Sequence, residues 1–153
     1  MREETVKIYK YDELSNTAKA KAREWYCQGA LDYNWWEFVY ETFDYLGIKI
    51  TSFDLGNSKG ITGRTLSQVS LYDVAKNIVK EYAEGPLREI ADEYLEAWGI
   101  NEDSADDVNF KHMVLQEALA MLQREHDYLL SEEQVEESIR ANEYEFTVDG
   151  KRW

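Results

Sequence analysis

VNFKHMVLQEALAMLQREHDY, residues 108–128, predicts the longest helix of the chain. At 1.5 Å of rise per residue it is about 30 Å long. Its apolar positions predict burial of Met113, Ala118, Leu119 and Leu122. We therefore expect the rest of the domain to pack around this helix.

Two amphipathic helices precede it, separated by Gly85-Pro86, which ends one and starts the next. Their apolar positions are Leu71, Val74, Ala75, Ile78, Val79 and Tyr82 in the first, and Leu87, Ile90, Ala91, Tyr94, Leu95 and Trp98 in the second. The repeated 3.6-residue period predicts that each helix buries one face against its neighbours.

Helical patterns also occur near both ends of the chain. Ser15 is a candidate N-cap for a helix that continues to about Gly29, with Ala18, Ala22, Trp25 and Tyr26 at helical spacing. The next helix spans about Trp35 to Leu46, with Trp35, Phe38, Val39, Thr42, Phe43 and Leu46 in one stripe, and Gly47 ends it. Ser131 with Gln134 forms a capping box for a last helix to about Asn142.

Residues 5–11, 48–55 and 144–148 alternate with a period of two, which predicts strands. Asp149-Gly150 predicts a hairpin turn onto Lys151–Trp153. Residues 56–70 are rich in Gly, Ser and Thr and predict a loop, with a short strand at residues 65–71 as the alternative. We expect an α+β fold: five to six helices on one face of a small, mostly antiparallel sheet.

Length and composition predict a single folded domain, residues 1–153. The chain has 44% hydrophobic residues, one Pro and one Cys, so no internal disulfide is expected. It has no apolar run of 18 residues and no apolar segment in its first residues, which predicts a cytoplasmic protein without membrane contact.

The charge is strongly uneven along the chain, whose net charge is −14. Residues 1–80 hold 11 acidic and 11 basic side chains, whereas residues 81–149 hold 20 acidic and 4 basic ones. Such a field repels nucleic acid and anionic membrane and attracts basic protein surfaces. We therefore expect a protein partner with a basic groove; the alternative is that the charge only keeps the protein soluble.

Three groups of carboxylates form the predicted acidic face. They are Glu89, Asp92, Glu93 and Glu96; Glu102, Asp103, Asp106 and Asp107; and Glu132, Glu133, Glu136 and Glu137. Carboxylates arrayed along a helix can replace the phosphates of a nucleic-acid backbone for a DNA-binding protein. The alternative is a solvated face with no partner.

Aromatic residues concentrate between Trp25 and Tyr45, which hold nine of the 21 in the chain. One helical stripe cannot bury them all, because Trp36 and Tyr40 point about 100° away from Val39 and Phe43. Either Trp36 and Tyr40 pack against the sheet, or they are exposed anchors for a protein partner.

Sites for catalysis, cofactors and metals are not recognisable. The loop of residues 56–65 resembles a phosphate cradle, but Ser58 and Arg64 stand where a Walker loop needs Gly and Lys. His112 and His126 lack zinc-ligand spacing, and Ala105 interrupts a calcium-like run in residues 101–107. We expect no cofactor, no metal site and no enzyme activity.

Several segments resemble one family of small phage and prophage proteins. The segments are IYKYDELS (8–15), AKAKAREWY (18–26), DYNWW (32–36), VYE (39–41), ANEYEFT (141–147) and DGK (149–151). The family is labelled "antitoxin of toxin-antitoxin stability system", and the similarity covers the first 45 residues and the last dozen. It implies a mobile-element origin and no catalytic motif.

Charge and resemblance together favour an inhibitor of a host defence complex, either anti-CRISPR or anti-restriction. The second hypothesis is an antitoxin that sequesters a basic toxin, although the chain lacks the basic DNA-binding domain and disordered tail of many antitoxins. The third is a nucleotide-binding enzyme that uses residues 56–65. The sequence leaves the oligomeric state undetermined.

Overall fold

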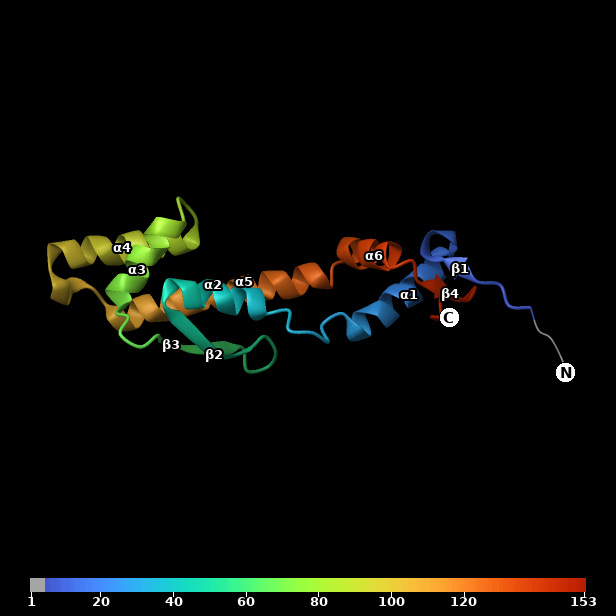
Figure 1. Ribbon diagram of the computed structural model, residues 1–153, viewed down its shortest axis with the longest axis horizontal. Helices are drawn as coiled ribbons and strands as arrows, with labels where there is room; N and C mark the ends of the chain where they lie inside the picture. The colour runs from blue at the N-terminus through green and yellow to red at the C-terminus, as the bar shows by residue number, and fades with distance from the viewer. Residues whose placement is uncertain (1–4) are drawn as a thin grey trace. The chain divides into compact units, whose positions relative to one another are not determined.

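The long helix predicted at residues 108–128 is present as α5, Asp107–Leu129, in a computed structural model that describes residues 5–153 apart from the side chain of Glu102 (Figure 1). Its buried residues include Phe110, Val114 and Leu122. Met113 is 37% exposed, so its predicted burial is wrong. At about 100° per residue the buried residues, from Phe110 to Leu119, cover about 180° of the helix, and Met113 lies about 60° outside that face on the Phe110 side.

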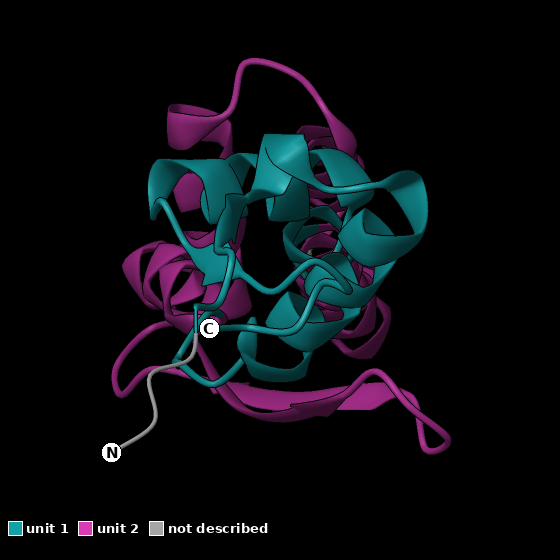
Figure 2. Ribbon diagram, turned by 90° about the vertical axis from the view of Figure 1, so that its right-hand side faces the viewer, with its two compact units in different colours: residues 1–35, 125–153 teal, residues 36–124 magenta. Residues whose placement is uncertain are grey.

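The chain divides into two compact units (Figure 2). Unit 1 contains the described residues up to Trp35 together with Glu125–Trp153, and unit 2 contains Trp36–Arg124. The division falls within α5, so this helix contributes residues to both units. The single domain expected for residues 1–153 stays a prediction.

Unit 2 contains α2 (Glu37–Leu46), β2 (Ile48–Asp54), β3 (Gly60–Thr65), α3 (Leu71–Glu81), α4 (Pro86–Ile100) and the 3₁₀ helix η2 (Glu102–Ser104). Gly47 ends α2 as predicted, with a φ of 109° that a side chain would disfavour. α3 packs on α4, and α2 packs on β2. Tyr94 of α4 stacks on Phe110 of α5 with ring centroids 4.2 Å apart, which joins α5 to this core.

β3 corrects the prediction for residues 56–70. The segment Gly60–Thr65 is a strand, paired antiparallel with β2, and residues 66–71 are not. A Cβ at Gly63 would lie 2.9 Å from Leu115 Cδ2 and 2.9 Å from the Lys49 carbonyl oxygen. Glycine is therefore required there because the strand passes close to α5 and β2, and its presence does not mark a loop.

Unit 1 contains β1 (Tyr9–Lys10), the 3₁₀ helix η1 (Tyr11–Glu13), α1 (Asn16–Gly29), α6 (Glu132–Ala141) and β4 (Glu145–Phe146). Its core is formed by Tyr11, Leu14, Ala18, Ala22, Val135, Ile139 and Phe146. The Ser15 hydroxyl accepts from the Ala18 N–H and caps α1 as predicted. The predicted hairpin at Asp149-Gly150 is confirmed, because Thr147 N–H donates to the Lys151 carbonyl at 2.8 Å.

Two predictions for unit 1 are corrected. The strand expected at residues 5–11 contains only Tyr9 and Lys10, since β4 offers just two partners, Phe146 and Glu145. The capping box of α6 is half formed: the Ser131 hydroxyl accepts from the Gln134 N–H, but the Gln134 side-chain carbonyl accepts from the Tyr128 hydroxyl at 2.8 Å. Gln134 therefore links the start of α6 to the end of α5.

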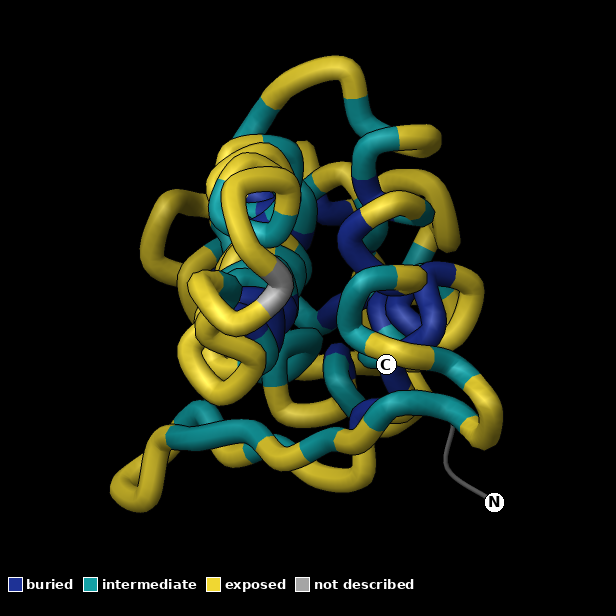
Figure 3. Tube along the Cα trace, turned by 90° about the vertical axis from the view of Figure 1, so that its left-hand side faces the viewer, coloured by how far each residue is buried: buried dark blue, intermediate teal, exposed yellow. Residues whose placement is uncertain are grey.

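The α+β class is confirmed. Among the described residues, six α-helices accompany two separate two-stranded antiparallel pairs, β1–β4 and β2–β3. Figure 3 shows the buried positions inside the helical parts, whereas the β2–β3 hairpin is buried only at Ile48 and Ile50. The helices therefore supply most of each core.

Candidate protein-binding surfaces

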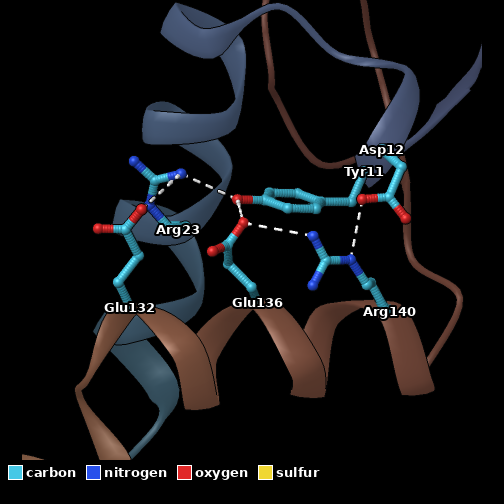
Figure 4. Close-up of polar contacts among 6 residues, drawn as sticks. All are labelled: Tyr11, Asp12, Arg23, Glu132, Glu136 and Arg140. Carbon is cyan, nitrogen blue, oxygen red and sulfur yellow. Dashed lines mark hydrogen bonds and ion pairs between the residues drawn. The ribbon is translucent and has the colours of Figure 1, made fainter.

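The acidic residues of α6 are partly used inside unit 1, in a cluster of Tyr11, Asp12, Arg23, Glu132, Glu136 and Arg140 that we call the Tyr11 cluster (Figure 4). The Tyr11 hydroxyl donates to Glu136 Oε2 at 2.7 Å and accepts from Arg23 at 2.9 Å. Arg140 donates to Asp12 at 2.8 Å, and Arg23 lies 3.9 Å from Glu132. Glu136 thus links α6 to η1, while Glu132, Glu133 and Glu137 are exposed, Glu132 beside Arg23 of α1.

Burial keeps the Tyr11 hydroxyl protonated. Tyr11 is 2% exposed, and this burial raises its pKa above the ordinary value of 10.0; the bond from Arg23 lowers the pKa and the bond to Glu136 raises it. A protonated hydroxyl can donate to Glu136 while it accepts from Arg23, so both charged partners are satisfied. The cluster is a structural use of acidic residues.

The acidic residues of α4 are arranged differently. Asp92 pairs with Arg88 at 2.9 Å. Glu89, Glu93 and Glu96 are exposed, and among the described residues none of them has a cationic partner. Their spacing of i, i+4 and i+7 places them in one row along the helix. We call these three residues the α4 row.

The acidic residues that follow α4 mainly organise the start of α5. Asp106 accepts from the Asn109 N–H at 2.9 Å, and Asp107 accepts from the Tyr94 hydroxyl at 2.5 Å. Asp103 is exposed, and the side chain of Glu102 lies outside the described residues. Within the part of the chain that is described, no group of three or more His, Cys, Asp or Glu side chains is arranged to hold a metal ion.

The twelve predicted acidic residues are divided between the two units. α4 and η2 are in contact within unit 2, whereas α6 belongs to unit 1. The expectation that all twelve form one acidic face stays a prediction. Within it, the α4 row has three exposed carboxylates on one element without a described ion pair, whereas Glu132 of α6 lies near Arg23.

Trp36 and Tyr40 pack against the sheet, which was one of the two alternatives for them. Both are half-buried, and their ring centroids lie 6.2 Å and 6.1 Å from that of Phe53 on β2. Burial also raises the pKa of Tyr40. Their aromatic surface is therefore used within unit 2, and a second role as partner anchors stays a prediction.

The exposed aromatic residues of α2 are Phe38 and Tyr45, which are 70% and 66% exposed. The predicted burial of Phe38 is wrong, because the buried residues Val39, Phe43 and Leu46 lie about 80–140° around the helix from it, which leaves Phe38 outside the buried face. The Tyr45 hydroxyl donates to Glu81 at the end of α3 at 3.0 Å, and this bond raises the pKa of Tyr45.

A pocket of about 310 Å³ lies beside these rings in unit 2. We call it the α2 pocket; it is lined by Phe38, Glu41, Thr42, Tyr45, Leu46, Glu81 and Tyr82. The sequence contained a signal for it, since Phe38 and Tyr45 are seven positions apart with Glu41 between them. The periodicity of α2 predicted Phe38 in the buried stripe, and exposure was considered only for Trp36 and Tyr40.

The segment 56–65 lacks the geometry of a phosphate loop. Gly60–Thr65 belongs to β3 and is paired with β2. In the turn before it, the Gly56 N–H donates to the Asp54 carboxylate at 2.7 Å. A phosphate cradle needs free backbone N–H groups without a competing carboxylate. The geometry therefore speaks against the nucleotide hypothesis.

Comparison with known proteins gave no similar sequence or structure: no protein-family model, no curated protein and no solved structure matches the chain. In the described part of the chain, no helix combines the length and apolarity needed to cross a membrane.

Proposed function

We propose that this protein inhibits a host defence complex by binding its basic groove in competition with nucleic acid. The α4 row is the observation that carries this proposal. Glu89 to Glu96 covers about 10 Å of helix axis at 1.5 Å per residue. One DNA strand presents about three phosphates over that length, at about 3.4 Å each. The row offers three carboxylates over the same distance.

The exposure of the row makes it available to a partner. Intramolecular ion pairs use the charges of Glu132, Glu136 and Asp92, but the α4 row has none among the described residues. Like charges at i, i+4 also destabilise a helix by about 0.2–0.5 kcal/mol per pair. A cationic groove would relieve that repulsion on binding.

The resemblance to phage and prophage proteins supports a defence complex as the partner, either a CRISPR effector or a restriction enzyme. In this proposal the protein acts in the cytoplasm of the bacterial host. It binds protein directly, without a catalytic step, a cofactor, a membrane or nucleic acid of its own.

The test compares wild type with the variant E89Q/E93Q/E96Q in capture from bacterial lysates that contain CRISPR, restriction and toxin systems. Wild type should retain a nucleic-acid-binding effector that moderate salt releases, and duplex DNA should displace it. The triple variant should associate at least about tenfold more slowly, because long-range attraction accelerates association by 10–1,000-fold.

The matched control is E133Q/E137Q, which removes two exposed charges from α6. If it weakens capture as much as the triple variant, net charge and not the α4 row is responsible. Capture that DNA does not displace would contradict competition with nucleic acid. Retention of a single small basic toxin would instead support the antitoxin hypothesis.

A further inference from the structure

The α2 pocket combines exposed aromatic rings with carboxylates. Phe38, Tyr45 and Tyr82 supply rings, and Glu41 and Glu81 supply the charges. Leu46, which is 1% exposed, lies beneath the rings at the base of the pocket lining. The rings of Phe38 and Tyr45 are left open to solvent, so a partner can still cover them.

The charge of the pocket selects a cation. Its described lining contains two carboxylates and no Lys or Arg. Aromatic faces attract cations through the negative face of the ring quadrupole, and carboxylates attract them directly. An anion would be repelled by both, and an uncharged apolar group would gain no attraction from the two carboxylates.

We propose that the α2 pocket receives an arginine side chain from the partner protein. A planar guanidinium stacks on aromatic rings and donates to carboxylates from its edge, whereas an ammonium does only part of this. At about 310 Å³ the pocket is at the lower end of the range of about 300–1,000 Å³ for ligand sites, which suits one side chain. This inference rests on the proposed function, because it requires a basic protein partner.

The pocket is preformed on one side. The bond from the Tyr45 hydroxyl to Glu81 Oε1 fixes that carboxylate beside the ring and leaves Oε2 available. Arg88 of α4 donates to the Tyr82 carbonyl at 2.8 Å and so holds the chain after α3 in place. The hydroxyl of Thr42 already donates to the Phe38 carbonyl at 2.9 Å, so it is not an unsatisfied donor in the pocket.

The test is an NMR titration of the full chain with N-acetyl-arginine-N-methylamide. We expect saturable shifts in the resonances of Phe38, Tyr45 and Tyr82. The citrulline counterpart has the same shape without the charge and should bind at least about tenfold more weakly, since hydrogen bonds to charged groups contribute more than neutral ones. The variant E81Q should weaken arginine binding to a similar extent.

The matched control is E84Q, which removes an exposed carboxylate near Glu81 that does not line the pocket. It should leave arginine binding unchanged within about twofold, because exposed charges contribute little at a distance. A backbone amide spectrum identical to that of wild type verifies that each variant is folded. F38A should weaken arginine binding about two- to fivefold through loss of a cation–π contact.

Equal binding of the arginine and citrulline compounds would overturn the proposal, as would saturable binding that E81Q does not change or no saturable shift at all. Shifts of the same resonances on raising protein concentration alone would overturn it too, since they would make a second copy the occupant. The titration contains no partner protein. The titration can therefore fail while capture through the α4 row succeeds. It can also succeed while capture fails, so the two proposals are tested separately.

Discussion

α4 and α6 are both acidic helices, but the structure uses their carboxylates differently. In α6, Glu136 receives the hydroxyl of the buried Tyr11, and Glu132 lies near Arg23. In α4, the row of Glu89, Glu93 and Glu96 has no cationic partner among the described residues. The comparison teaches that the net charge of −14 has two components. The carboxylate of Glu136 is used inside unit 1, whereas the carboxylates of the α4 row are left for solvent or a partner.

The first prediction is the largest. Tyr11→Ala should destabilise unit 1 by about 3–5 kcal/mol, because it empties a buried aromatic site and removes the hydroxyl between Arg23 and Glu136. Urea unfolding followed by circular dichroism measures this change. Tyr11→Phe is the control and should cost only about 1 kcal/mol, since the ring remains. Equal losses in the two variants would mean that the hydroxyl, not the ring, dominates.

Truncation of Trp36 and of Phe38, at the start of α2, should affect stability to very different extents. Trp36→Ala should lower stability by about 2–3 kcal/mol, because its half-buried ring packs on Phe53. Phe38→Ala should change stability by less than about 0.5 kcal/mol, because that ring is 70% exposed. Thermal and urea unfolding of the two variants check this. A large loss for Phe38→Ala would show that its ring packs within the fold and is not free for a partner.

Removal of a single charge from the Tyr11 cluster should cost less stability than removal of the Tyr11 or Trp36 ring. Glu136→Gln should cost about 1–2 kcal/mol, because the bonds from Tyr11 and Arg140 lose their charged acceptor. Glu93→Gln on α4 removes the same chemical group where it has no described partner and should cost nothing measurable. Paired urea titrations compare the two. Similar values for both would contradict the structural role assigned to α6.

Alkaline pH should weaken the Tyr11 cluster by a smaller amount. The pKa of Tyr11 is raised in the folded state, so its stabilising contribution is complete below the unfolded pKa of about 10 and is lost as pH rises through the folded pKa. Urea midpoints of wild type should therefore fall above about pH 10 more than those of Tyr11→Phe. Tyr40 and Tyr82, whose pKa values burial also raises, are present in both proteins and so contribute equally to the two curves. Parallel curves would therefore show that Tyr11 is not the source of the pH dependence.

The helices could be predicted from the sequence because their patterns are local. Ser15 starts α1 through its side-chain hydroxyl and Gly47 ends α2 through its backbone freedom, and both were identified. β1 and β3 were misplaced because pairing with a distant partner determines a strand. Tyr9 and Lys10 are a strand only where Phe146 and Glu145 meet them, and glycine at Gly63 fits β3 because Leu115 lies close by.

The candidate sites were predicted less well for the same reason. Composition revealed an excess of acidic and aromatic residues, but it could not tell which of them have partners. That Glu136 meets Tyr11 across 125 positions, or that Phe53 covers Trp36 and Tyr40, follows only from tertiary contacts. The α2 pocket was missed because Phe38 was assigned to the buried stripe, whereas it lies at the edge of that stripe and is exposed.

The smallest predicted effect is also the sharpest test of the comparison. E89Q/E93Q/E96Q should leave stability unchanged or raise it by up to about 0.5 kcal/mol, because it removes like-charge repulsion along α4 and breaks no described contact. Urea unfolding at low salt measures this, and added salt should erase the gain by screening the same repulsion in wild type. A loss above about 1 kcal/mol would mean that the α4 row stabilises the fold as α6 does. Unchanged stability with lost capture of the partner would instead assign the row to binding, because no structural role would remain to explain three adjacent carboxylates.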